Sequence, residues 1–123
     1  MKRRKLSVAE RHEIYEKCDN HCAYCGVYIG FEDMQVDHVM PLRKGGADSL
    51  DNMLPACRSC NHYKSTLTLE QFRANIERMP EVLTRDNATY KIASRFGVIK
   101  VVRPKVKFYF EKWEAFDERQ KQE

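Results

Sequence analysis

Polar and apolar positions near the start of the chain repeat at the spacing of an amphipathic helix. On a helix drawn over residues 7–17, the apolar side chains fall on one side: Val8, Ile14 and Tyr15. Ser7 and Glu10 have the spacing of a capping box, in which each side chain accepts a hydrogen bond from the other residue's backbone N–H. We therefore expect a helix from Ser7 to Lys17.

Two short apolar runs, residues 34–40 and 53–56, stand in the middle of the chain. A loop containing Gly45-Gly46 separates them, and glycine commonly interrupts regular structure. A short helix is expected from Arg58 onward. The order of strand, loop, strand and helix predicts an α+β fold.

Helical spacing returns after Thr68, which has capping-box spacing to Gln71. The apolar positions of this helix are Leu69, Phe72, Ile76 and Met79. Pro80 is expected to end it, because proline removes a backbone donor from a helix interior. A second helix is expected from about residue 86 to 95, with Gly97 just after its last turn.

The last third of the chain contains two runs of β-branched and aromatic residues, 98–102 and 106–110. They flank Arg103-Pro104-Lys105, and this arrangement indicates a C-terminal β-hairpin. Aromatic residues of this region, Trp113 among them, are expected in the core and not on a base-stacking surface. Residues 111–123 carry mixed charges and are expected to form a frayed helix.

The length and composition fit one folded unit. The chain has 123 residues, of which 42% are hydrophobic and 33% charged, and this size suits a single core. Its apolar runs are all much shorter than the roughly 20 residues that a helix needs to cross a bilayer. The basic start of the chain leads into an amphipathic stretch instead of a signal-peptide core. We therefore expect a cytoplasmic protein without membrane contact.

The net charge of +4 arises from 22 basic and 18 acidic residues, and basic residues 2–5 account for the excess. A second basic stretch runs from Arg85 to Lys107, where seven basic residues are opposed only by Asp86. Nucleic acid is a natural partner of such surfaces. Charge runs that merely keep a protein soluble are equally common, so charge by itself leaves both interpretations open.

Five cysteines in a chain without a secretion signal favour metal binding over disulfides. Four of them form two CxxC pairs, Cys22 with Cys25 and Cys57 with Cys60. Four thiolates are what a closed tetrahedral zinc site requires. The segment between the pairs, residues 26–56, is longer than the about 15–20 residues of a zinc ribbon, so a further element is inserted there.

A redox-active dithiol is the alternative interpretation of each CxxC pair. Two such pairs without a thioredoxin-like βαβ pattern make it the less favoured one. Cys18 precedes the first pair too closely to replace one of its ligands. We expect Cys18 to be a small buried hydrophobic residue.

The inserted segment and the residue after Cys60 carry a second set of polar groups: Asp37, His38, Asn52 and Asn61. Carboxylate and amide oxygens are hard ligands that suit Mg²⁺ or Mn²⁺. An imidazole that zinc does not need suits proton abstraction near neutral pH. An isolated Asp-His pair is more often a turn or surface pair, and that interpretation stays open for these residues alone.

Residues 37–46 and 51–65 closely resemble the HNH endonuclease signature, in the subgroup with two CxxC zinc knuckles. The resemblance covers residues 22–65, about a third of the chain. It implies a ββα-metal core, also called a His-Me finger, that a four-cysteine zinc site holds together. Flanking helices and the hairpin would complete the fold. We thus expect a single nuclease domain over residues 1–123, with an extension at 68–123.

The resemblance implies roles for the polar residues. His38 is the first motif histidine and would be the general base that takes a proton from water. Asn52 is the middle asparagine and would hold the loop that carries His38. Asn61 stands where many members have a second histidine, and with Asp37 it would bind one Mg²⁺ or Mn²⁺ ion. His62 comes one residue late, so we expect a surface residue or a DNA contact there, with ligation as the alternative.

Asp37 and His38 are neighbours, and neighbouring residues of a strand face opposite ways. A metal site that uses both requires an irregular backbone, which the sequence does not predict. The zinc ion, by contrast, would be structural, because it would bracket strands and a helix that are too small to be stable unaided. Cys57 and Cys60 would lie at the start of the helix that presents Asn61.

The resemblance implies double-stranded DNA as substrate, held by salt-sensitive phosphate contacts with low sequence specificity. The expected contacts are Arg43, Lys44, Arg58 and Lys64. One active site per chain makes nicking the expected outcome, by a monomer or a weak dimer. Three alternatives stay open: a zinc-dependent DNA-binding module that does not cleave, an adaptor that uses its zinc knuckles for protein contacts, and RNA as the substrate.

Overall fold

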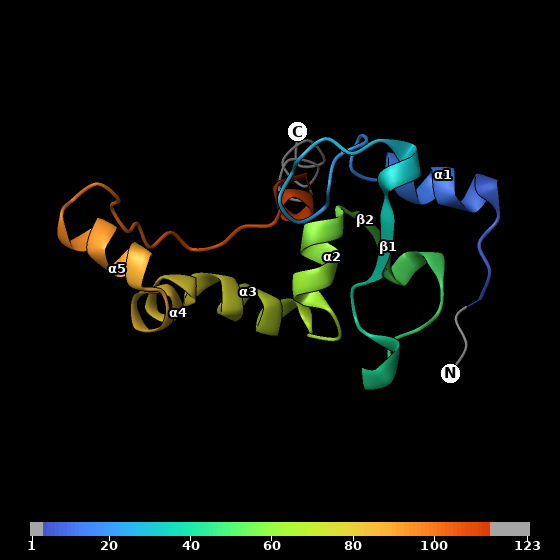
Figure 1. Cartoon of the computed structure of the whole chain (residues 1–123). Coiled ribbons are helices and arrows are strands. Elements are labelled where there is room, and N and C mark those ends of the chain that lie inside the picture. Colours follow the sequence, from blue (N-terminus) through green and yellow to red (C-terminus); the bar gives the residue numbers. More distant parts are fainter. Residues whose placement is uncertain (1–3, 114–123) are drawn as a thin grey trace, which may run out of the picture. The chain divides into compact units, whose positions relative to one another are not determined.

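The computed structural model describes residues 4–113 of the chain, and Figure 1 shows their helices and strands. Helix α1 spans Val8–Glu16 and begins with the predicted capping box. The Ser7 side chain accepts from the Glu10 backbone N–H, and the Glu10 carboxylate accepts from that of Ser7. Ile14 and Tyr15 are buried as expected, whereas Val8 is 67% exposed. The two buried residues fix which side of α1 faces the core.

The sheet has two antiparallel strands, β1 over Gln35–His38 and β2 over Met53–Ala56. The register runs from the pair Gln35 and Ala56 to the pair His38 and Met53. Helix α1 packs on β2, and helix α2, Arg58–Lys64, packs on β1 (Figure 1). A buried cluster joins α1 to β2 and to the segment before β1: Ile14, Tyr15, Ile29, Met34 and Met53. The predicted order of strand, loop, strand and helix, and with it the α+β class, is confirmed.

Between residues 68 and 97, all of which the structure describes, the chain contains one more helix than the sequence predicts. Helix α3 spans Leu69–Glu77, α4 spans Met79–Asp86, and α5 spans Ala88–Arg95. Pro80 lies in the first turn of α4, where the missing N–H would have had no helical partner in any case. Pro80 therefore starts a helix, and the prediction that it only ends one was wrong.

The predicted C-terminal β-hairpin is also wrong. Within the described part of the chain, residues 98–102 and 106–110 form no strand, and residues 109–113 are helical. Val98 is 80% and Val102 75% exposed. Runs of β-branched residues favour strands only where a partner strand and a packed face are present, and an isolated hairpin is marginally stable at best. Residues 2, 3 and 114–123, which include part of the predicted basic tetrad and frayed helix, lie outside the described residues.

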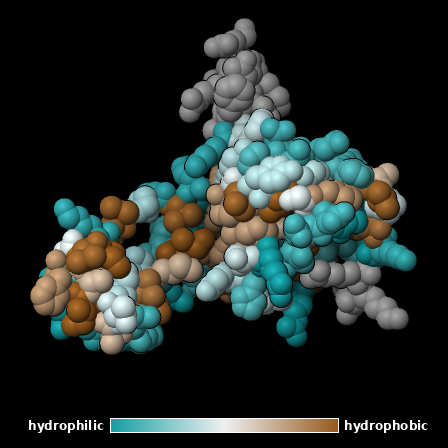
Figure 2. Space-filling view, turned by 45° about the horizontal axis from the view of Figure 1, so that its top comes forward, coloured by the Kyte–Doolittle hydropathy of each residue, from teal (hydrophilic) through white to brown (hydrophobic). Residues whose placement is uncertain are grey.

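The contacts of the chain group it into two units. Among the described residues, one unit takes residues 4–69 together with residues 107–113, and the other takes residues 70–106. The second unit contains the packed pair α4 and α5, and apolar side chains gather on its surface (Figure 2): Val82, Leu83, Ile92, Phe96 and Val98. Among the described helices, none has the length and apolar character that crossing a membrane demands. The candidate site lies in the first unit.

Candidate functional site

The four paired cysteines meet in one place. Their Sγ atoms all lie within 4.8 Å of one another. Cys57 is the N-cap of α2, and its Sγ accepts from the Cys60 backbone N–H at 3.4 Å. The residues after Cys22 form a tight turn, in which the Gly26 N–H donates a hydrogen bond to the Cys22 carbonyl at 3.0 Å. The predicted four-cysteine metal site is therefore present, with α2 starting at it.

Ionised thiols in this cluster repel one another unless a cation lies between them. Hydrogen bonding from Cys60 lowers the pKa of Cys22 to about 4, whereas burial raises the pKa of Cys25 to about 11. The bond shared with Cys22, together with burial, raises the pKa of Cys60 far above its ordinary value. One thiolate thus disfavours the next, and a divalent cation at the centre removes that repulsion. Four sulfur donors at this spacing fit a soft, tetrahedral metal ion.

Cys18 and Asn61 occupy the neighbourhoods that the sequence predicts. Cys18 is 2% exposed, as expected for a small buried residue. Asn61 directly follows Cys60 in α2, so one short helix connects the cysteine cluster with the second set of polar residues. His62 is exposed on the same helix.

His38 ends strand β1 and is nearly enclosed, with 5% of its side chain exposed. Its Nε2 lies 2.9 Å from Oδ1 of Asp48. Its Nδ1 is buried and has no hydrogen-bond partner among the described residues. One nitrogen of the imidazole is therefore engaged, and the other has unused hydrogen-bonding capacity.

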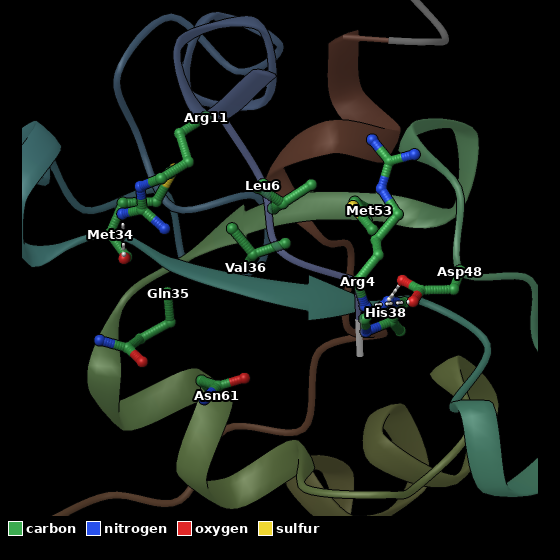
Figure 3. A pocket seen from close by; sticks show the side chains of 10 residues that line it. All are labelled: Arg4, Leu6, Arg11, Met34, Gln35, Val36, His38, Asp48, Met53 and Asn61. Carbon is green, nitrogen blue, oxygen red and sulfur yellow. Dashed lines mark hydrogen bonds and ion pairs between the residues drawn. The ribbon is translucent and has the colours of Figure 1, made fainter. Parts of the chain in front are cut away.

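His38 and Asn61 line the same pocket, a cavity of about 300 Å³ beside β1. Figure 3 shows Asn61 on α2, beside β1, and the contact of His38 with Asp48 at the end of that strand. Arg4 and Arg11 line the same cavity from the segment before α1 and from α1 itself. An imidazole, an amide and two guanidinium groups thus border one space large enough for a phosphate group.

Asp37 faces a different space. It lines a smaller neighbouring pocket of about 150 Å³ together with His38, Arg43 and the residues after α2. Asp37 and His38 both lie in the regular ladder, opposite Leu54 and Met53. The backbone irregularity that a shared metal ion requires is therefore not seen at these two residues, and His38 is the residue common to both pockets.

The Asp37 carboxylate is buried and engaged at one oxygen. Its Oδ2 accepts a hydrogen bond from the Tyr24 hydroxyl at 2.5 Å and lies 3.0 Å from Nζ of Lys64. Burial and the negative charge of Asp37 raise the pKa of Tyr24 above its ordinary value, so the phenol stays a donor. The other oxygen, Oδ1, accepts no hydrogen bond within the described part of the chain.

Lys64 corrects one of the predicted DNA contacts. Its side chain is fully buried, and Nζ also donates to the backbone carbonyl of His38 at 3.1 Å. A buried ammonium group with two protein acceptors is not presented to a phosphate. The other three predicted contacts, Arg43, Lys44 and Arg58, are exposed.

Asn52 crosses the base of the loop between the strands. Its Oδ1 accepts from the Met40 N–H at 2.9 Å, and its Nδ2 donates to the carbonyls of Met40 at 2.8 Å and Ala47 at 2.9 Å. Gly46 is required beside these bonds, because a Cβ there would lie 1.8 Å from the Met40 carbonyl oxygen. All hydrogen-bonding groups of the Asn52 amide thus connect the two ends of the loop.

Two residues of this site escape sequence reasoning. Tyr24 stands between two cysteines of the cluster and resembles a spacer, and Asp48 resembles a turn residue after Gly45-Gly46. The signal for Asp48 was its place in the glycine-containing loop that follows the strand carrying His38. No local signal marks Tyr24, because its partner Asp37 lies on another element.

Comparison with known proteins identifies this segment. Residues 22–66 match the family model for HNH endonuclease, which confirms the resemblance drawn from the motif residues. The CRISPR-associated endonuclease Cas9 of Corynebacterium diphtheriae is 31% identical over 55 residues, 44% of this chain and 5% of that protein. That of Actinomyces naeslundii is 38% identical over 45 residues, 36% of this chain and 4% of that protein.

A solved structure agrees with the sequence comparisons. The crystal structure of the Type II-C Cas9 enzyme from Actinomyces naeslundii matches 61% of this chain and 8% of its own, with a TM-score of 0.51 and 27% identity. The chain spans about a twentieth of the curated relatives that it matches. The likeness therefore concerns the HNH segment and its surroundings, not the whole of those proteins.

Proposed function

We propose that the protein is a metal-dependent endonuclease that hydrolyses phosphodiester bonds of double-stranded DNA. The observation that carries this proposal is the pocket shared by His38 and Asn61, two residues of the segment that matches the HNH model. A non-cleaving module or an adaptor would not need a buried imidazole with an unused nitrogen beside a pocket. Cas9 relatives named as endonucleases support the same reaction class.

In this proposal His38 is the general base. Its imidazole takes a proton from the water molecule that attacks the phosphorus atom. A positioned base of this kind contributes about 10²–10⁴-fold to the rate. Asn52 acts indirectly, since its three hydrogen bonds hold the loop that follows His38.

Asp37 and Asn61 are the proposed donors of the catalytic ion, and they line two neighbouring pockets that have His38 in common. Oδ1 of Asp37 is the carboxylate oxygen that accepts no hydrogen bond from the described residues, and the Asn61 amide offers a second hard oxygen donor. This donor chemistry fits Mg²⁺ or Mn²⁺ better than zinc. Such an ion, when bound, supplies Lewis-acid stabilisation of the charge that grows on the phosphate oxygens. The ammonium group of Lys64 lies beside the other oxygen of Asp37, Oδ2, and its positive charge offsets the negative charge of the buried carboxylate.

We assign zinc to the four-cysteine cluster, in a structural role. The cluster links the Cys22 turn to the start of α2, and α2 packs on the strand that carries His38. Zinc would thus order the frame of the catalytic residues. Unoxidised thiol ligands suit a reducing compartment such as the cytoplasm.

Exposed Arg43, Lys44 and Arg58 would contact DNA phosphates. Contacts to the backbone carry no sequence information, so we expect low sequence specificity. One site per chain acts on one strand, and a nick is the expected product of a monomer or a weak dimer.

The test uses supercoiled plasmid, the zinc-loaded full chain and Mg²⁺ or Mn²⁺, with the same reaction without Mg²⁺ or Mn²⁺ as the control arm. Open circular product in the metal arm only is expected. His38→Ala should lower the rate by about 10²-fold or more. His12→Ala is the matched control, because His12 is an exposed histidine of α1 outside both pockets. Plasmid binding without nicking in the presence of either ion would instead identify a non-cleaving DNA-binding module.

A further inference from the structure

We infer that Asp48 is the positioning residue of His38: its carboxylate accepts the Nε2 hydrogen and leaves Nδ1 as the nitrogen that takes the proton from water. This inference rests on the proposed nuclease function, which it deepens by assigning the base to one atom. The contact that supports it is the 2.9 Å separation between His38 Nε2 and Asp48 Oδ1.

The chemistry of the two groups decides the direction of this hydrogen bond. An ionised carboxylate can only accept, so Nε2 must carry the hydrogen. A neutral imidazole has one N–H and one lone pair, which therefore lies on Nδ1. Nδ1 is the atom of His38 that is buried without a partner among the described residues. An attacking water molecule would donate a hydrogen bond to this lone pair, which no described residue satisfies.

Asp48 is itself held at both oxygens. Oδ2 accepts from the Arg4 backbone N–H at 2.7 Å, while Oδ1 faces His38 (Figure 3). The hydrogen bond from Arg4, followed by that from His38, holds the pKa of the Asp48 carboxyl below its ordinary value. Two anchors on one carboxylate fix its plane, and they fix the imidazole ring that it meets.

The loop that carries Asp48 is fixed as well. The Ala47 carbonyl, one residue earlier, accepts from Asn52 Nδ2 at 2.9 Å. Asn52 thereby restrains both ends of the loop: Met40, shortly after His38, and Ala47, next to Asp48. These hydrogen bonds position Asp48 beside His38, and they do not involve the contact between Asp48 and His38. A carboxylate in this place also stabilises the imidazolium ion that forms when His38 takes the proton.

The first experiment reads the ring proton directly. Zinc-loaded, ¹⁵N-labelled full chain without Mg²⁺ or Mn²⁺ is examined by long-range ¹H–¹⁵N correlation NMR in mildly alkaline buffer. The His38 signals are identified by their loss in His38→Ala. The proton is expected on Nε2 in the wild-type protein, and a mixture of both tautomers is expected in Asp48→Ala. A wild-type ring protonated on Nδ1 overturns the inference.

The second experiment measures plasmid nicking by Asp48→Asn and Asp48→Glu. Asp48→Asn keeps the shape and loses the charge, so kcat should fall about 10²-fold while KM changes less than about 3-fold. Asp48→Glu keeps the carboxylate and should recover part of kcat. Asp51→Asn is the matched control, because Asp51 is an exposed aspartate of the same segment and should leave kcat unchanged. Zinc content and thermal unfolding confirm that each variant is folded.

The outcomes separate this inference from the proposed function. A kcat of Asp48→Asn within about 2-fold of wild type, or a loss confined to KM, overturns the positioning role. Absence of nicking by the wild-type protein would refute the proposed nuclease function. The NMR result would then still decide whether Asp48 sets the tautomer of His38, because it is measured without DNA or a catalytic ion.

Discussion

Nζ of Lys64 lies 3.0 Å from Oδ2 of Asp37, and both side chains are buried. The pair joins the last residue of α2 to a residue of β1, and the Tyr24 hydroxyl donates a hydrogen bond to the same oxygen of Asp37. An opposite charge at this distance offsets the cost of burying the carboxylate. The four-cysteine cluster at the start of α2 thus joins the helix to the Cys22 turn, and this ion pair at its end joins it to the strand that carries His38.

Lys64→Met should destabilise the protein strongly. Methionine fills a similar volume but leaves Asp37 buried without its cation, and breaking a buried pair in this way costs about 3–5 kcal/mol. Urea unfolding of the zinc-loaded chain measures the effect. Lys5→Met is the control, because Lys5 is exposed, and its effect should stay within about 0.5 kcal/mol. A Lys64→Met protein as stable as this control would show that the pair contributes little.

Asn52→Ala should loosen the loop after β1 and slow nicking. It removes the acceptor of the Met40 N–H, so hydrogen exchange at the Met40 amide should accelerate. Asn52→Asp separates the two halves of the side chain. It keeps the acceptor for Met40 but cannot donate to the carbonyls of Met40 and Ala47, so the Met40 amide should remain protected while nicking slows. Equal exchange rates in all three proteins would contradict this account.

Gly46→Ala and Gly45→Ala form a matched pair. A Cβ on Gly46 would meet the Met40 carbonyl oxygen at 1.8 Å, so the backbone of the loop must move. Gly45 has φ of +90°, but a Cβ on it would have no neighbouring atom within 4 Å, so alanine there costs only conformational strain of about 1–2 kcal/mol. Thermal unfolding and nicking should therefore be impaired much more by Gly46→Ala. The reverse order would be inconsistent with the loop geometry.

Metal binding to the cysteine cluster should strengthen as pH rises. The raised pKa values of Cys25 and Cys60 mean that both thiols are protonated near neutral pH in the metal-free protein, whereas Cys22 is ionised. Metal binding displaces at least those two protons, and each displaced proton raises the apparent affinity about tenfold per pH unit. Competition with a chromophoric chelator between about pH 6.5 and 7.5 measures the slope. A pH-independent affinity would mean that the thiols are already ionised.

Removing exposed basic residues should change the salt dependence of DNA binding. Each lost phosphate contact lowers the slope of log affinity against log salt by about 1. Arg43→Ala and Arg58→Ala should each have this effect, because both side chains are exposed. Fluorescence anisotropy with a labelled duplex at several salt concentrations gives the slopes. Slopes equal to wild type for both variants would place the DNA contacts elsewhere.

The sequence by itself determined the features that depend on near neighbours. The capping box of Ser7 and Glu10 needs only a spacing of three residues, and each CxxC pair positions its own two sulfurs. The order of strand, loop, strand and helix follows from short apolar runs and the turn residues between them. The motif residues from 37 to 65 are sufficient by themselves to identify the HNH segment. These features can be predicted because they do not depend on which elements pack against one another.

Only the tertiary structure decided the contacts that cross between elements. Lys64 meets Asp37 because α2 packs on β1, and Asp48 meets His38 because of the path of one loop; neither pairing is encoded in local spacing. The same dependence explains the errors. Residues 98–102 have strand-forming side chains but no partner strand among the described residues, and Pro80 is compatible with the first turn of a helix as well as with the end of one. Local propensity is worth a fraction of a kcal/mol per residue, and the packing partner that completes or overrides it lies far away in the chain.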